Sequence, residues 1–127
     1  NQSKFGEFKL TEAETSAINQ WLPSANEEVF AFFSSDPNNP NEIFFFLSSF
    51  NNAADAKKDS EDFRKTIIAG KMKIVSEKQL ASGLILHYAG KKNFGIMDCR
   101  DRLCTSISGD EKDKVERFYQ LISKGQK

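Results

Sequence analysis

Two cysteines separated by four residues constrain this chain more than any other feature. Cys99 and Cys104 flank the charged segment Arg100-Asp101-Arg102-Leu103, and apolar residues recur around both cysteines. Two alternating segments joined by a short polar turn are typical of a β-hairpin. Pairing Cys99 with Cys104 also pairs Met97 with Ser106 and Ile96 with Ile107. One face of the hairpin is then mostly apolar and should face the core: Phe94, Ile96, Thr105 and Ile107.

The cysteine pair also bears on location and on metal binding. A disulfide is typical of an oxidising compartment, whereas two reduced, buried cysteines are the alternative. Zinc sites need more ligands than two cysteines and the single histidine, His87, so we predict no metal and no cofactor. The chain begins at Asn1 without Met and without an apolar signal segment, which suits either a processed mature protein or a trimmed chain. We favour the first and expect a periplasmic or secreted protein whose signal peptide was removed before Asn1. A lipid anchor ahead of Asn1 and any oligomeric state are compatible with the sequence.

Composition narrows the fold class and the partners. A chain of 127 residues suits a single domain over 1–127, and twelve Phe with an apolar fraction of 39% suffice for a core. The 18 basic residues balance the 18 acidic ones, which argues against a nucleic-acid partner. No apolar run is long enough to predict a membrane span.

Periodicity and turn residues predict the secondary structure. Thr11 and Glu14 have the spacing of a capping box, so we expect a helix over 11–22 that Pro23 ends. The last helix follows Asp110 and carries Val115, Phe118, Tyr119 and Ile122 on one side. The other predicted elements are strands over 5–10, 28–33, 43–47, 72–80 and 84–88, a turn over 36–41, a helix over 52–69 and the two cysteine strands. This order indicates an α+β domain with one mainly antiparallel sheet and about three helices.

This order of elements resembles the Mog1/PsbP-like sandwiches, including the DcrB-like bacterial envelope lipoproteins. The resemblance rests on the hairpin Val29–Leu47, the helix around Phe63, the strands Met72–Tyr88 with Gly83 at their turn, and the closing helix around Phe118. The helix over 11–22 and the cysteine hairpin depart from that family. Its members are mostly non-catalytic accessory or binding proteins, so the resemblance implies no particular active site.

The charged hairpin turn is the main candidate site. A braced turn presents Arg100, Asp101, Arg102 and Leu103 at little entropic cost, and rigid arginines are favoured interface residues. A similar C-x4-C loop occurs in Ivy-type lysozyme inhibitors, but this loop lacks the histidine of that family. We add Asn38 and Asn39, in the loop between Pro37 and Pro40, as a second partner-binding element. Alternatively, charged residues at a hairpin tip merely keep it soluble.

The sequence therefore predicts a non-enzymatic envelope or secreted protein, inhibitor- or immunity-like, that occludes a partner protein such as a toxin or an envelope enzyme. An alternative function is a periplasmic accessory protein that binds a lipid or other small apolar ligand through Phe32, Phe33, Phe44 or Phe46. A third is a hydrolase that uses His87 with a nearby acid, although a strand position between Leu86 and Tyr88 is more typical of a structural histidine.

Overall fold

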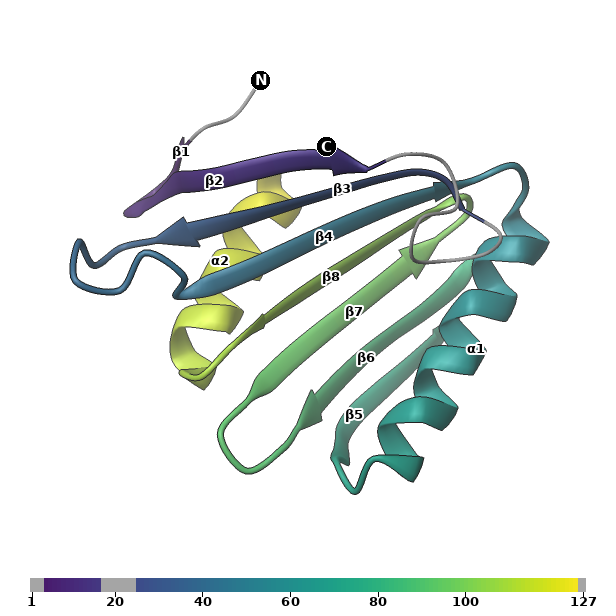
Figure 1. The fold of residues 1–127 in the computed structure, drawn as a ribbon. Coiled ribbons are helices and arrows are strands. Elements are labelled where there is room, and N and C mark those ends of the chain that lie inside the picture. Colours follow the sequence, from purple (N-terminus) through teal and green to yellow (C-terminus); the bar gives the residue numbers. More distant parts are fainter. Residues whose placement is uncertain (1–3, 17–24, 126–127) are drawn as a thin grey trace.

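The fold is a single antiparallel sheet with one helix on each of its faces (Figure 1). The computed structural model describes residues 4–16 and 25–125. The strands run in the order β1-β2-β3-β4-β8-β7-β6-β5, so two consecutive meanders meet where β4 pairs with β8. The elements are β1 (Lys4–Phe5), β2 (Phe8–Ser16), β3 (Ala25–Ser34), β4 (Ile43–Phe50), α1 (Ala53–Ala69), β5 (Lys73–Leu80), β6 (Gly83–Ala89), β7 (Phe94–Arg100), β8 (Leu103–Gly109) and α2 (Lys112–Gly125).

The prediction of an α+β fold with one antiparallel sheet is confirmed, but the predicted helix at 11–22 is wrong over 11–16. These residues belong to β2, which pairs with β3 along most of its length. The Thr11 hydroxyl does not cap a helix. It lies 3.0 Å from the carbonyl oxygen of Phe32 and 2.7 Å from that of Pro40. Pairing with a neighbouring strand therefore overrides the local capping signal, and residues 17–22 lie outside the described part of the chain.

The two helices bury two separate apolar clusters. In β7, Phe94 and Ile96 point towards α2, whereas Met97 and Cys99 point towards α1. On the α2 face, Phe118 lies at the centre of a group of aromatic rings that includes Phe5, Phe8, Phe33 and Phe45. β7 is covered on both sides because it packs against both helices, which explains its continuous apolar run, whereas residues 44–47 of β4 are only partly buried.

A buried ion pair fixes the β3–β4 loop to α2. The Glu42 side chain is 1% exposed, and its carboxylate accepts hydrogen bonds from Lys114 and from the backbone and hydroxyl of Ser35. Burial raises the pKa of Glu42, but the hydrogen bonds from Lys114 and Ser35 outweigh it, so the pKa lies below its ordinary 4.5. A depressed carboxyl pKa stabilises the fold above about pH 4.5, and this stabilisation is lost as the pH falls through the folded-state value.

We expect Glu42→Gln to lower the free energy of unfolding by about 2 kcal/mol at pH 7, because it leaves Lys114 without its buried partner. The difference from the unsubstituted protein should shrink as the pH falls through the lowered folded-state pKa of Glu42, because the protonated carboxyl then no longer pairs with Lys114. Urea unfolding at pH 7 and at a series of acidic pH values measures this. Glu111→Gln is the matched control, since the exposed Glu111 carboxylate lies 3.7 Å from the same lysine. An equal loss in both variants would contradict the assignment.

Candidate functional site

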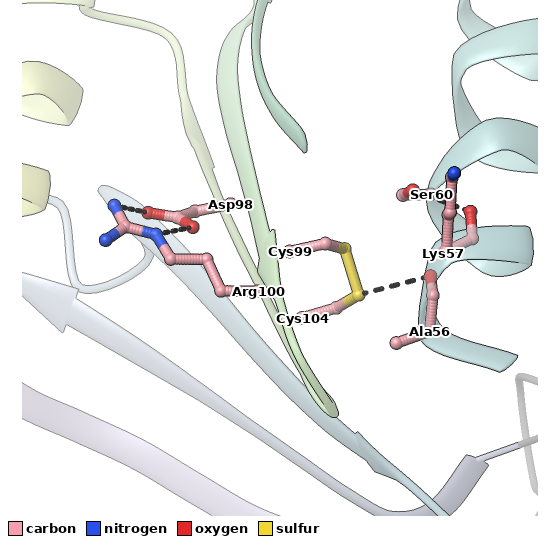
Figure 2. The surroundings of a disulfide bond; sticks show 7 residues. All are labelled: Ala56, Lys57, Ser60, Asp98, Cys99, Arg100 and Cys104. Carbon is pink, nitrogen blue, oxygen red and sulfur yellow. Dashed lines mark hydrogen bonds and ion pairs between the residues drawn. A yellow bond between two sulfur atoms is a disulfide. The ribbon is translucent and has the colours of Figure 1, made fainter. Parts of the chain in front are cut away.

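The predicted cysteine hairpin is confirmed, with Cys99 opposite Cys104, Met97 opposite Ser106 and Ile96 opposite Ile107. The two cysteines form a disulfide. It lies beneath α1, where the Cys104 sulfur is 3.8 Å from the carbonyl oxygen of Ala56, and both cysteines are buried (Figure 2). The disulfide therefore cross-links the hairpin on the face covered by α1, and the opposite face of the turn is left uncovered by it. A disulfide of this kind is typical of proteins from an oxidising compartment.

Backbone hydrogen bonds hold the turn of this hairpin from both flanks. The Asp101 amide donates to the carbonyl oxygen of Ser82 in the β5–β6 turn at 2.8 Å. On the other flank, the Phe50 amide at the end of β4 donates to the carbonyl oxygen of Arg102 at 2.9 Å. Asp101 adopts a positive φ of 53°, a conformation that Asp tolerates better than most residues. Neighbouring strands and the disulfide thus fix the backbone that carries the exposed side chains.

An aspartate organises the polar side chains on the α2 face of the hairpin. The Asp98 carboxylate accepts two hydrogen bonds from the Arg100 guanidinium, at 2.8 and 2.9 Å, and one from the Tyr119 hydroxyl of α2 at 2.5 Å. The hydrogen bond to Asp98 raises the pKa of Arg100. Burial, together with the bond to Asp98, raises the pKa of Tyr119, so its hydroxyl stays protonated and donates. Figure 2 shows Asp98 and Arg100 on the side of the sheet away from the disulfide.

A shallow hollow of about 310 Å³ lies beside this network. Leu103 borders it with 51% of its surface exposed, and the Arg100 side chain is 53% exposed. The remaining lining residues are Asp98, Asp101, Arg102 and Thr105. We call these six residues the hairpin surface. Four of them are the residues that the sequence predicted. Asp98 and Thr105 were missed as site residues, because the sequence pattern indicated only that they lie in the two strands of the hairpin.

The structure does not bring Asn38 and Asn39 near the hairpin surface. Along the pairing of β4 with β8, Ser49 lies opposite Leu103 at one end and Ile43 opposite Gly109 at the other. Ile43 and Ser49 are six residues apart, which is about 20 Å along a strand that rises about 3.3 Å per residue. The β3–β4 loop adjoins the Ile43 end and is therefore at least that far from the hairpin turn. Ser34 closes this loop on itself, because its hydroxyl lies 2.7 Å from the Asp36 carbonyl oxygen and 2.6 Å from that of Asn39. The two predicted partner-binding elements are therefore separate surfaces.

The phenylalanines proposed for an apolar ligand also divide between the two faces. Phe33 is 4% exposed and belongs to the core beneath α2. Phe32 and Phe44 lie with their ring centroids 5.2 Å apart on the α1 face, and Phe44 stacks on Phe46 at 6.4 Å. One pocket cannot contain all four side chains, because strand neighbours 32 and 33 point in opposite directions.

His87 lies on the α2 face among aromatic rings. Its ring centroid is 6.3 Å from Phe94 and 6.2 Å from Tyr119. Over residues 4–16 and 25–125, no carboxylate lies within hydrogen-bonding distance of His87. The Tyr119 hydroxyl is committed to Asp98 rather than to the imidazole. The contacts of His87 are thus those of a packed strand residue.

Tyr119 is, like Asp98, a residue of this network that the sequence pattern did not identify as part of a site. Its place in the apolar stripe of α2 predicted a core side chain. The one signal in the sequence for its polar contact is the hydroxyl group that a tyrosine carries.

No helix in the described residues is long and apolar enough to cross a membrane. No protein-family model, curated protein or solved structure matches this chain.

Proposed function

We propose that this chain is a non-enzymatic protein-binding module of the periplasm or of a secreted fraction, which occludes a partner through the hairpin surface. The observation that carries the proposal is an exposed leucine beside two arginines, on a backbone held by neighbours on both flanks. Arginine and large apolar side chains that are already ordered contribute most to binding, because little conformational entropy is lost on association.

The chemistry of the hairpin surface defines the partner. Leu103 suits a shallow apolar pocket, and Arg102 suits a carboxylate at the rim of that pocket. Arg100 is already neutralised by Asp98, to which it is bound through two nitrogens. It therefore acts as a flat, oriented guanidinium that leaves its remaining N–H groups for the partner. An inhibitor or an immunity protein that blocks a toxin or an envelope enzyme fits this description.

We expect Arg102→Glu combined with Leu103→Ser to weaken binding at least 30-fold, the effect of losing about 2 kcal/mol at an interface hot spot. Partners are captured from envelope and secreted fractions with the oxidised protein, and the captured protein is then titrated by calorimetry. Lys91→Glu with Lys92→Glu is the matched control, because these exposed lysines lie in the β6–β7 loop at the other end of the sheet. The control should retain full affinity.

Arg100 is excluded from the test variant because Arg100→Glu would place a second carboxylate against Asp98 and destabilise the hairpin. The melting temperatures of the test and control variants should therefore agree with that of the unsubstituted protein. A partner that binds the test and control variants equally well would exclude the hairpin surface as its binding site.

A further inference from the structure

A small cavity on the opposite face of the sheet has the composition of a cation site. It is partly open to solvent and has a volume of about 120 Å³ between α1 and the strands β4, β7 and β8. That volume is about four times the share of one water molecule in the liquid, enough for a group of about five non-hydrogen atoms. The lining combines apolar and aromatic side chains with one carboxylate and two hydroxyls: Phe46, Ser48, Asp59, Phe63, Met97, Cys104 and Ser106.

The two phenyl rings of this cavity are held in place by other aromatic side chains. Phe63 of α1 meets Tyr88 edge to face, with ring centroids 5.5 Å apart. Phe46 of β4 stacks on Phe44 with an interplanar angle of 11°. The cavity therefore presents rings whose orientation does not depend on a ligand, as cation–π binding requires.

Asp59 is the charged group of the lining, and no described residue pairs with it. Within residues 4–16 and 25–125, the Asp59 carboxylate has no hydrogen bond and no ion pair. Burial, together with the negative charges of Asp62 and Glu28, raises its pKa from 3.8 to about 6 against the opposing effect of Lys58. Lys58 is the nearby cation, but its ammonium group forms its ion pair with Asp62. Above pH 6 the cavity thus contains a half-buried negative charge that no ion pair among the described residues neutralises.

We propose that this cavity binds a small organic ammonium group, of the size of a trimethylammonium, against Phe46 and Phe63 with Asp59 as its counter-ion. Aromatic rings together with a carboxylate form the usual environment of quaternary ammonium ligands. A strongly hydrated metal ion is disfavoured, because phenyl rings and a thioether cannot replace its oxygen ligands. The proposal is independent of the hairpin surface, which lies on the other face of the sheet.

Choline and its neutral isostere 3,3-dimethyl-1-butanol are the probes. We expect choline to bind at least tenfold more tightly than the isostere at pH 7.5, and to shift the methyl NMR signal of Met97 but not that of Met72. Affinity should fall about tenfold at pH 5, where only about one Asp59 in eleven is ionised, given a pKa near 6. Equal binding of the two probes, or no shift at Met97, would overturn the proposal.

Two variants and one control assign the site. Asp59→Asn and Phe63→Leu should each weaken choline binding at least tenfold, whereas Glu61→Gln, on the exposed side of the same helix, should not. Asp59→Asn also removes an unpaired half-buried charge, so its melting temperature above pH 6 should equal or exceed that of the unsubstituted protein. Choline binding that survives Asp59→Asn in the folded protein would refute the role of this carboxylate.

A further experiment distinguishes the two possible sources of the ammonium group, a lipid headgroup and a free small amine. Vesicles of phosphatidylcholine and of phosphatidylglycerol are sedimented with the protein, with and without free choline. If the protein sediments with phosphatidylcholine vesicles but not with phosphatidylglycerol vesicles, and free choline prevents this, the ligand is a lipid headgroup. Choline binding without vesicle binding would identify a free small amine.

Discussion

Phe118→Ala is expected to lower the free energy of unfolding by about 4 kcal/mol and the melting temperature by about 15 °C. Phe118 is fully buried, and its ring centroid lies 4.8 Å from that of Phe33 and 5.4 Å from that of Phe8. Removing it opens a cavity where α2 meets the sheet, and the surrounding rings cannot close the space because they belong to different elements. Urea unfolding and calorimetry measure the two quantities.

Phe32→Ala is the matched control for this substitution. Phe32 lies on the other face of the sheet, is only partly buried, and contacts Phe30 and Phe44. We expect a loss of about 1 kcal/mol, since a partly exposed ring gains less from burial. If both variants lost the same stability, Phe118 would not be the centre of the packing beneath α2.

Gly83→Ala is expected to cost more than about 3 kcal/mol of folding free energy, because β6 and β7 approach too closely at this position to admit a side chain. A Cβ atom added to Gly83 would lie 1.8 Å from the carbonyl oxygen of Cys99. The obstacle is backbone, so no side chain can move aside. The strands must separate next to the hairpin turn, and the hydrogen bond from Asp101 to Ser82 is lost with them.

Gly90→Ala is the control for Gly83→Ala. A Cβ atom at Gly90 would be 3.4 Å from the nearest atom of Met72, an ordinary contact. The change should be neutral or slightly stabilising, because alanine restricts the unfolded chain more than glycine does. Chemical denaturation distinguishes the two variants. Hydrogen exchange at Asp101 should accelerate only in Gly83→Ala, and unchanged protection there would contradict the predicted strand separation.

Locally encoded elements could be predicted from the sequence. The stripe of Val115, Phe118 and Ile122 predicted a helix with a buried side, and all three residues are buried. Asn52 caps α1, because its side chain accepts a hydrogen bond from the Asp55 amide. The hairpin register followed from the alternation around Cys99 and Cys104. In each case the determining contacts lie within a few residues of one another in the chain.

The helix predicted over 11–22 is wrong over 11–16, and the separation of Asn38 from the arginines could not be derived from the sequence. Both features depend on partners distant in the sequence. Thr11 lies against Phe32 and Pro40, and the position of Asn38 relative to Leu103 depends on the direction of β4 beside β8. A capping box specifies a helix only where no strand competes for the same backbone groups.

The sequence by itself determined the hairpins, the cysteine pairing, helices α1 and α2, and the antiparallel character of the sheet, because short-range periodicity and turn chemistry encode these features. Only the tertiary structure decided that the helices cover opposite faces, that the disulfide lies beneath α1, and that Asp98 joins Arg100 to Tyr119. These arrangements arise from packing between residues that are remote in the chain, which no local pattern specifies.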